Sequence, residues 1–348
     1  MINIQTDISL LPYNTFGIQA KAAYFIEYTS TDELREAISW LQSPSVKSLP
    51  VLHIGGGSNL LFTQDFPGVI LHSRMEGLKI VSEGKKDDAE ATDDILLRVA
   101  SGMVWDDFVA YCVEHGYYGA ENLSLIPGEV GASAIQNIGA YGAEAGDIID
   151  SVELMSLSTG ESRVMSSADC QYSYRQSIFK NELRGEYAVT YVTFRLHRTF
   201  SPKLDYGNVR SELEKRGLDI TAANVRQVII DIRRAKLPDP AQLGNAGSFF
   251  MNPIISRSAY EQLLTAHPDM PHYDVDQDRV KVPAGWLIDR CGWKGQSLGA
   301  AGVHAHQALV LVNRGGATGA DIIALSDAVR ASVRERFGID IHPEVNFI

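Results

Sequence analysis

The chain has 348 residues, of which 45% are hydrophobic and 21% charged, an ordinary balance for a folded protein that excludes disorder as its main state. Its length predicts two or three domains, because single hydrophobic cores rarely grow beyond about 250–300 residues. The formal net charge of −12 argues against nucleic acid or an anionic membrane surface as the main partner.

The first 70 residues alternate between strand and helix patterns. Ala22–Tyr28 is rich in β-formers, and Ser30-Thr-Asp-Glu33 has the capping-box pattern that opens a helix. Strands are predicted at Val51–Ile54 and Gly68–His72, with a glycine loop directly after the first. This order predicts a small α+β unit.

The middle of the chain changes to short strands around a glycine-rich segment. The predicted strands are Leu78–Ser82, Ile95–Ala100, Val152–Leu157 and Tyr187–Leu196. An amphipathic helix at Val104–His115 is expected to end at Gly116. From Gly116 to Gly146 there are seven glycines and little periodicity, which indicates a long functional loop. The charges at Lys85–Glu90 are interpreted as an exposed hairpin tip.

The last third of the chain is again mixed. Helices are predicted at Ala222–Lys236, Ser256–His267 and Ala317–Gly338, the last with apolar residues at helical spacing. The chain ends in the strand-like segment Ile341–Ile348, which we expect to return to a sheet formed earlier in the sequence.

The cysteines and the N-terminus bear on the compartment. Cys112, Cys170 and Cys291 are odd in number and widely spaced, which favours a reducing compartment over a disulfide framework. No basic segment precedes an apolar stretch at the N-terminus, and no apolar run reaches the length of a membrane span. A cytoplasmic protein is therefore expected.

Two glycine-rich loops are the strongest sign of a ligand. In Gly55-Gly-Gly-Ser-Asn59 the backbone amides can approach an anion closely, although three glycines alone are better explained by a strained turn that needs positive φ. The loop lacks the third glycine of the Rossmann fingerprint and is not a Walker A loop. The second loop, Ile126–Gly142, combines small residues with the hydrogen-bonding groups of Ser133, Gln136 and Asn137. Together the loops suggest a large cofactor with a diphosphate and an aromatic ring system.

These loops belong to a set of motifs that spans nearly the whole chain, from Tyr13 to Val345. The set resembles the UDP-N-acetylenolpyruvoylglucosamine reductase (MurB) family of peptidoglycan synthesis. The matching motifs are Asn14-Thr-Phe-Gly17, Gly55–Asn59, Gln136-Asn-Ile-Gly-Ala-Tyr-Gly142, Tyr174-Arg-Gln-Ser-Ile-Phe-Lys180, Lys236-Leu-Pro-Asp-Pro240 and Asn245-Ala-Gly-Ser-Phe-Phe250. The loop around Tyr206 points to the longer class of this family.

The resemblance implies an α+β fold of the vanillyl-alcohol-oxidase-like FAD-binding kind. Two FAD-binding subdomains are expected at residues 1–72, joined by 339–348, and at 73–235, with a substrate-binding domain at 236–338. The implied activity is NADPH-dependent, FAD-mediated reduction of an enolpyruvyl ether on a UDP-sugar. FAD is expected to be bound non-covalently, and a monomer is the default expectation.

Three residues are the implied catalytic group. Ser248 would give a proton to the substrate carbanion, although its turn alone predicts only a packed structural serine. Arg175 would bind the substrate carboxylate as a planar fork, where a surface salt bridge is the plain alternative. Glu344 would assist only when protonated, and its plain alternative is an exposed residue of the C-terminal tail.

The resemblance also implies binding residues for the cofactor and the substrate. The implied FAD-binding residues are Gly55, Gly56, Gly57, Ser58, Asn59, Ser133, Gln136 and Gly139. The implied substrate-binding residues are Tyr174, Tyr206, Lys236, Asn252 and Gln307. Ala134, Met251 and Asn346 depart from the family pattern and affect peripheral contacts. His304 and His306 share a strand face without an evident third ligand, so no metal is expected.

Two other functions compete with this interpretation. The nearest is an FAD oxidase of the same broad fold, against which the combination of Ser248, Arg175 and Glu344 argues. The other is a non-catalytic nucleotide-sugar sensor, against which the intact motifs argue.

Overall fold

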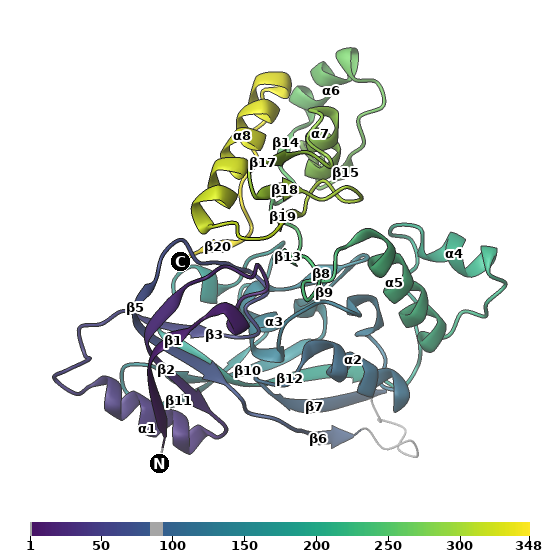
Figure 1. Ribbon diagram of the computed structural model, residues 1–348. Helices are drawn as coiled ribbons and strands as arrows, with labels where there is room; N and C mark the ends of the chain where they lie inside the picture. The colour runs from purple at the N-terminus through teal and green to yellow at the C-terminus, as the bar shows by residue number, and fades with distance from the viewer. Residues whose placement is uncertain (1, 84–92) are drawn as a thin grey trace. The chain divides into compact units, whose positions relative to one another are not determined.

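The computed structural model describes residues 2–83 and 93–348, and the chain divides into two compact units (Figure 1). The first unit contains residues 1–8, 22–56 and 67–233, and the second contains residues 9–21, 57–66 and 234–348. The three-part division expected from the sequence stays a prediction. The Lys85–Glu90 cluster lies outside the described residues.

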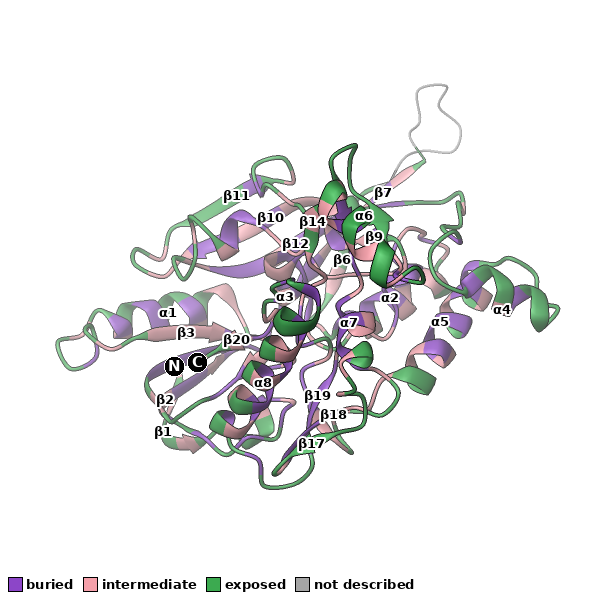
Figure 2. Cartoon of the chain, turned by 90° about the horizontal axis from the view of Figure 1, so that it is seen from above, coloured by how far each residue is buried: buried purple, intermediate pink, exposed green. Residues whose placement is uncertain are grey.

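A four-stranded sheet with the strand order β1-β2-β5-β3 begins the first unit. Its strands are β1 (Asn3–Ser9), β2 (Lys21–Tyr28), β3 (Val51–Ile54) and β5 (Phe66–Ser73). Helix α1 (Thr31–Leu41) starts where the Ser30 side chain accepts a hydrogen bond from the backbone N–H of Glu33, as the capping pattern predicts. One side of α1 is buried and the other is exposed (Figure 2).

The larger sheet of the first unit is antiparallel and has the order β11-β10-β12-β7-β6. Its strands are β6 (Leu78–Glu83), β7 (Asp94–Ala100), β10 (Ile149–Ser156), β11 (Ser162–Ser166) and β12 (Tyr187–His197). Helices α2 (Trp105–Glu114) and α3 (Val130–Gln136) lie on one side of it (Figure 1). The rings of Trp105, Phe108 and Phe194 contact one another in the core between helix and sheet.

The first unit also carries a helix pair. Helix α4 (Val209–Lys215) and helix α5 (Ala222–Lys236) share a small apolar core. The bounds of α5 agree with the sequence prediction, whereas α4 was not predicted. Short elements complete this unit: η2 (Glu121–Leu123), β8 (Gly139–Ala140), β9 (Ala143–Glu144), η3 (Ala145–Asp147) and η4 (Ile178–Lys180).

The second unit contains three helices and, besides the pair β20-β4 described below, two small sheets. One sheet has the order β13-β19-β18-β17 and the other has the order β14-β16-β15. Their strands are β13 (Gly244–Asn245), β14 (Ile254–Ser256), β15 (Tyr273–Asp274), β16 (Arg279–Lys281), β17 (Ser297–Leu298), β18 (Ala301–Val303) and β19 (Leu311–Asn313). The helices are α6 (Arg257–Ala266), α7 (Ala284–Arg290) and α8 (Gly319–Phe337), and η1 (Leu11–Tyr13) is a short 3₁₀ turn.

The C-terminal segment returns to an early part of the chain, but only its residues 346–347 form a strand, and within the described residues this strand joins no earlier sheet. Strand β20 (Asn346–Phe347) pairs in parallel with β4 (Leu60–Leu61), which directly follows the first glycine loop. No helix in the described residues is long and apolar enough to cross a membrane. The mixed helix and sheet content confirms the predicted α+β class.

One expectation for residues 116–146 was wrong. The segment is not a continuous loop, because it contains η2, α3, β8, β9 and η3. Helix α3 escaped prediction because its sequence, Val130-Gly-Ala-Ser-Ala-Ile-Gln136, is short and has no amphipathic period. It is stabilised from outside: the backbone N–H groups of Val130 and Gly131 donate to the carbonyls of Met103 and Ser101.

Candidate functional site

The two glycine loops lie against each other in the first unit. A Cβ atom added to Gly56 would be 3.4 Å from the Cα of Gly128, and one added to Gly55 would be 3.2 Å from the Cβ of Ala132. Gly128 itself has a left-handed φ of +121°. Glycines at these positions therefore let the loop after β3 and the loop before α3 approach at backbone distance. Two segments more than 70 residues apart form one wall made mostly of backbone.

Gly57 belongs to the second unit, and contacts within that unit determine its conformation. Its φ is +64°, and an added Cβ would be 2.0 Å from the carbonyl oxygen of Tyr13. The Gly57 carbonyl accepts from the backbone N–H of Thr15 at 3.2 Å. Both the left-handed conformation and the close approach require glycine here. The strained-turn explanation therefore holds for Gly57, while Gly55 and Gly56 serve the contact with the second loop.

The Asn14–Gly17 motif connects this turn to the segment that carries Ser248. The buried side chain of Asn14 donates to the carbonyls of Leu10 and Ile18 at 2.7 and 3.0 Å. The hydroxyl of Thr15 donates to the carbonyl of Asn245 at 2.6 Å, and the Asn245 N–H donates back to Thr15 at 2.9 Å. The motif is therefore a structural clamp within the second unit.

Ser248 is exposed on a tight turn that its neighbours anchor. Gly247 has φ +68°, and Phe249 and Phe250 are fully buried. The Phe249 N–H donates to the carbonyl of Leu309 at 2.7 Å. The Ser248 hydroxyl makes no hydrogen bond to another residue in the described part of the chain. The two phenylalanines thus hold the turn in the core while the serine side chain faces outward.

The structure brings Glu344 beside this turn. Phe250 forms an isolated antiparallel bridge with Pro343, and the Glu344 N–H donates to the carbonyl of Phe249 at 2.7 Å. The Glu344 side chain is half-buried, and its backbone carbonyl accepts from the Asn59 side chain at 3.4 Å. Ser248 and Glu344, nearly 100 residues apart in sequence, are neighbours across this bridge.

Asn252 and Gln307 also gather in the second unit, at the start of α7. The Asn252 side-chain oxygen accepts from the backbone N–H of Ala284 at 2.9 Å. A Cβ added to Gly285 would be 3.2 Å from the side-chain oxygen of Gln307. Two amide side chains expected near the enolpyruvyl group thus lie near the same helix end. Lys236, at the end of α5, is exposed.

Arg175 lies in the first unit against the second glycine loop. Its Nη2 donates to the carbonyl of Gly139 at 2.7 Å, and its Nη1 to the carbonyl of Asn137 at 3.4 Å. Its guanidinium lies 5.4 Å from the ring of Tyr174. A Cβ added to Gly139 would be 2.8 Å from Nη1, so Gly139 leaves space for the guanidinium. A surface salt bridge was the plain alternative for Arg175, but backbone carbonyls of the glycine loop hold this guanidinium.

Other predicted residues of the first unit have more varied surroundings. The buried Ser133 hydroxyl donates to the carbonyl of Val130 at 2.7 Å and keeps its acceptor capacity. Tyr206 is 38% exposed and packs near the second glycine loop. A Cβ added to Gly142 would be 3.1 Å from the Cβ of Tyr206. Gln136 is half-buried at the end of α3.

Sequence reasoning missed two charged groups next to the glycine wall. Glu129 precedes α3 as its N-cap residue, and its carboxylate lies within 3.2 Å of a Cβ built on Gly55. The Nε2 of His72 lies 3.1 Å from this carboxylate, and its Nδ1 lies 3.0 Å from the carboxylate of Glu27. Burial opposes the charge of His72, but hydrogen bonds and charges from Glu129 and Glu27 outweigh it and raise its pKa. The Glu129 carboxylate beside Gly55 is thus paired with a ring whose pKa is raised.

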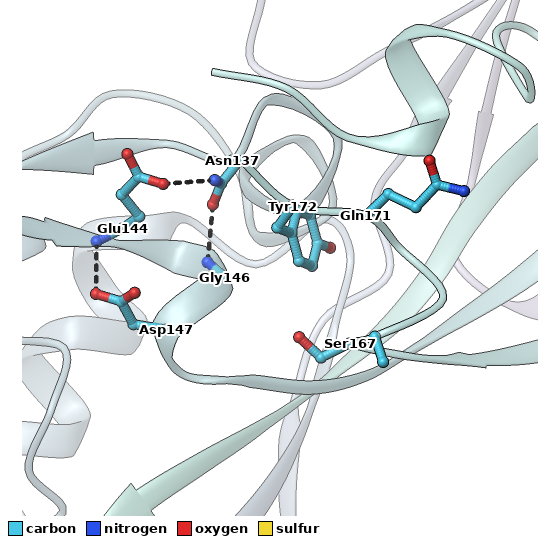
Figure 3. A pocket seen from close by; sticks show the side chains of 8 residues that line it. Asn137, Glu144, Gly146, Asp147, Ser167, Gln171 and Tyr172 are labelled. Atoms are coloured by element: carbon cyan, nitrogen blue, oxygen red, sulfur yellow. Dashed lines mark hydrogen bonds between the residues drawn. The ribbon is translucent and has the colours of Figure 1, made fainter. Parts of the chain in front are cut away.

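A polar pocket of about 340 Å³ opens beside the second glycine loop (Figure 3). Its lining residues are Asn137, Glu144, Gly146, Asp147, Ser167, Ala168, Gln171 and Tyr172. None of the predicted catalytic or binding residues lines it. The hydrogen bonds drawn in Figure 3 instead link the residues that shape the loop carrying Gly139.

Comparison with known proteins gives consistent results over the whole chain. Residues 22–166 match an FAD binding domain, and residues 239–348 match the C-terminal domain of UDP-N-acetylenolpyruvoylglucosamine reductase. The chain is 61% identical over 340 residues to the UDP-N-acetylenolpyruvoylglucosamine reductase of Bacteroides fragilis strain YCH46, covering 98% of each chain. It is 49% identical over 347 residues to the enzyme of that name from Porphyromonas gingivalis strain ATCC 33277, covering 100% of both.

A solved structure supports the same fold. The crystal structure of UDP-N-acetylenolpyruvylglucosamine reductase (MurB) from Thermus caldophilus superimposes with a TM-score of 0.65 at 21% identity. The match covers 100% of this chain and 98% of that one. At this identity the likeness concerns the fold.

Proposed function

Because the chain belongs to the UDP-N-acetylenolpyruvoylglucosamine reductase family, we propose that it reduces the enolpyruvyl ether of UDP-N-acetylglucosamine enolpyruvate to UDP-N-acetylmuramate. The reaction is a step of peptidoglycan precursor synthesis, and through it the protein contributes to cell shape and cell division. It acts in the cytoplasm as a monomer on a small UDP-sugar, with NADPH as the hydride donor and without a nucleic-acid partner.

The contact between the two glycine loops carries the FAD part of the proposal. Gly56 meets Gly128 at backbone distance and Gly55 lies against Ala132, and these contacts form the kind of wall that an elongated cofactor with a diphosphate needs. The residues proposed to hold FAD are Gly55, Gly56, Gly57, Ser58, Asn59, Ser133, Gln136 and Gly139. The domains proposed to carry these roles are 1–72 with 339–348, 73–235 and 236–338.

When bound and reduced, FAD supplies a hydride for the β-carbon of the enolpyruvyl group. Ser248 then donates its hydroxyl proton to the α-carbon, which completes addition of a hydride and a proton across the double bond. An enolate is a far stronger base than an alkoxide, so a positioned serine suffices as the acid, and geometry matters more than acidity. The exposed hydroxyl of Ser248, on a turn anchored by buried Phe249, supports this role.

Charge that develops on the substrate carboxylate requires partners. Arg175 is proposed to bind the carboxylate oxygens through its planar N–H fork. Glu344 is proposed to share a proton with the carboxylate, and the hydrogen bond from its backbone N–H to Phe249, the residue after Ser248, supports this role. Asn252 and Gln307 would hydrogen-bond near the enolpyruvyl group, and their shared position at the start of α7 supports a common ligand.

The remaining substrate residues are proposed for the UDP-sugar. Lys236 would bind the diphosphate, since its ammonium is exposed at the end of α5. Tyr206 would close over the nucleotide, and Tyr174 would line the sugar side. The packing of the Tyr206 loop against Gly142 supports a link between nucleotide and cofactor segments within the first unit.

Replacement of Ser248 by alanine tests the proposal. Flavin reduction by NADPH should stay near the wild-type rate, while flavin reoxidation by the enolpyruvyl substrate should slow by about 10²–10⁴-fold, as for loss of a general acid. Ser258→Ala, which removes another exposed hydroxyl of the second unit, is the matched control. Equal slowing of both half-reactions would assign Ser248 a structural role.

The same measurements separate the competing functions. An oxidase of the same broad fold would be reoxidised rapidly by air after reduction, whereas this enzyme should be reoxidised slowly by air and rapidly by the enolpyruvyl substrate. A nucleotide-sugar sensor would show a flavin spectrum that NADPH does not bleach.

A further inference from the structure

The backbone of Arg175 has an unusual conformation that its surroundings must maintain. Its φ is +57°, in the left-handed region, which costs a residue with a Cβ about 1–2 kcal/mol. The ammonium of Lys180 donates to the Arg175 carbonyl at 2.8 Å, and the hydroxyl of Ser177 donates to the carbonyl of Ile135 at 2.6 Å. The turn that carries Arg175 is thus fastened to the end of α3.

The amide side chain of Asn137 is the central connection of this region. Asn137 is fully buried, and its Nδ2 donates to the Glu144 carboxylate at 2.8 Å and to the Ser173 carbonyl at 2.9 Å. Its Oδ1 accepts from the backbone N–H of Gly146 at 2.8 Å (Figure 3). A carbonyl can only accept and a backbone N–H can only donate, so these partners fix the orientation of the amide.

Those three bonds join the two segments on which the guanidinium depends. Glu144 and Gly146 belong to the same turn as Gly139, whose carbonyl accepts from Arg175. Ser173 precedes Arg175 by two residues, and its carbonyl is held by the same amide. The Asn137 carbonyl is itself the second acceptor for the guanidinium. Asn137 therefore holds both the backbone segment that leads into Arg175 and the turn whose carbonyls accept from the Arg175 guanidinium.

The conformation of Asn137 suits this place. Its φ is +47° at the C-cap of α3, and asparagine tolerates the left-handed region better than most side chains. Glycine would allow the same backbone but would lose all three side-chain bonds. The residue type thus combines a left-handed helix end with an amide that has two donors and an acceptor.

We propose that Asn137 is a positioning residue for Arg175: its buried amide sets the separation of the Gly139 turn from the Ser173–Arg175 segment and thereby orients the guanidinium toward the substrate carboxylate. This inference rests on the proposed function of Arg175. A displacement of about 1 Å in such a group can lower a rate about 10²-fold, so the predicted effect is kinetic rather than a loss of the fold.

Asn137→Asp is the main test. It keeps the shape and tolerates the left-handed backbone, but it replaces both Nδ2 donors by a carboxylate oxygen facing Glu144. In the flavin-loaded enzyme, reoxidation by the enolpyruvyl substrate should slow about 10–100-fold, and reduction by NADPH should change less than threefold. Glu144→Gln, which keeps an acceptor for the amide, should stay within threefold of wild type. Ser167→Ala, which lines the same pocket outside these bonds, is the control.

A double-mutant cycle with Arg175→Lys decides whether Asn137 acts through Arg175. If it does, adding Asn137→Asp to Arg175→Lys should slow reoxidation by less than threefold more. Full multiplication of the two separate effects would overturn the inference while leaving the role of Arg175 intact. Normal reoxidation in Arg175→Lys alone would instead contradict the proposed function. Should Asn137→Asp fail to retain flavin, Glu144→Ala removes one amide partner, and the same cycle with that variant distinguishes the same outcomes.

Discussion

The two carboxylates around His72 predict that this histidine stabilises the folded protein and that its contribution depends on pH. His72, on β5, is buried, with its two ring nitrogens 3.0 Å from Glu27 and 3.1 Å from Glu129. Burial disfavours the charged ring, but the two carboxylates outweigh this effect and raise the pKa of His72 above 6.5. The perturbation is His72→Gln, which keeps a polar side chain and removes the charge.

The stability that His72→Gln should lose follows from how deeply Glu129 and Glu27 are buried. The side chain of Glu129 is 9% exposed and that of Glu27 is 34% exposed, so Glu129 would be left as a buried charge without its counter-ion. Removing one partner of a buried ion pair costs about 3–5 kcal/mol. Because Glu27 retains access to water and glutamine can still donate one hydrogen bond, we expect a loss of about 3 kcal/mol at pH 6.

The pH dependence has a definite sign. The folded-state pKa of His72 lies above its unfolded value of 6.5, so the stabilisation is fully present below pH 6.5 and is lost as pH rises through the folded pKa. The difference in unfolding free energy between wild type and His72→Gln should therefore shrink above pH 6.5. The decrease can reach at most about 1.4 kcal/mol per pH unit.

Urea unfolding followed by circular dichroism at several pH values between about 5.5 and 9 measures this difference. His197→Gln is the control, because His197 approaches Asp94 at the same 3.0 Å but its side chain is 51% exposed. An exposed pair contributes about 1 kcal/mol or less, so the control should lose little stability. A difference for His72→Gln that stays constant over the whole range would show that folding does not raise the pKa of His72.

Two glycines give further predictions. Gly57→Ala should lower the free energy of unfolding by several kcal/mol, since its Cβ would lie 2.0 Å from a backbone carbonyl oxygen. Gly217, with φ +62° and open space around it, is the control, and Gly217→Ala should lower this free energy by only about 1–2 kcal/mol through backbone strain. Equal decreases in the two urea midpoints would contradict this prediction. Gly139→Ala should displace the flexible end of Arg175 and slow flavin reoxidation by substrate about tenfold or more, with a smaller loss of stability than Gly57→Ala. A stopped-flow rate unchanged from wild type would refute that reasoning.

Elements with local signals were predicted well from the sequence. Strand β3 and helix α5 have the bounds expected for them, because alternation, apolar spacing and the proline after α5 are read within one segment. Helix α3 was missed since its stability comes from carbonyls at Ser101 and Met103, outside its own sequence. Helix α7 was also missed, because it is short and lacks a side-chain cap.

The residues of the candidate site also differ in whether the sequence alone indicates them. Motif residues such as Ser248 and Arg175 could be named from the sequence because the family pattern marks them, and their roles stay predictions. The ion pair of His72 and Glu129 was not, because 57 residues separate its members and no fixed spacing in a sequence reports such a contact. Asn137 was noted as a hydrogen-bonding group, but its function as a link between two turns depends on tertiary packing that only the structure provides.

Backbone strain is concentrated where function is proposed. Among the described residues, six that are not glycine have a left-handed φ, and three of them, Asn137, Tyr141 and Arg175, lie on the second glycine loop and the turn against it. Each costs about 1–3 kcal/mol and persists only where surrounding bonds hold it. The bonds of Asn137 and Lys180 do so here. At Asn137 the side chain makes three hydrogen bonds that glycine could not make, and these bonds fit the proposed placement of the Arg175 guanidinium.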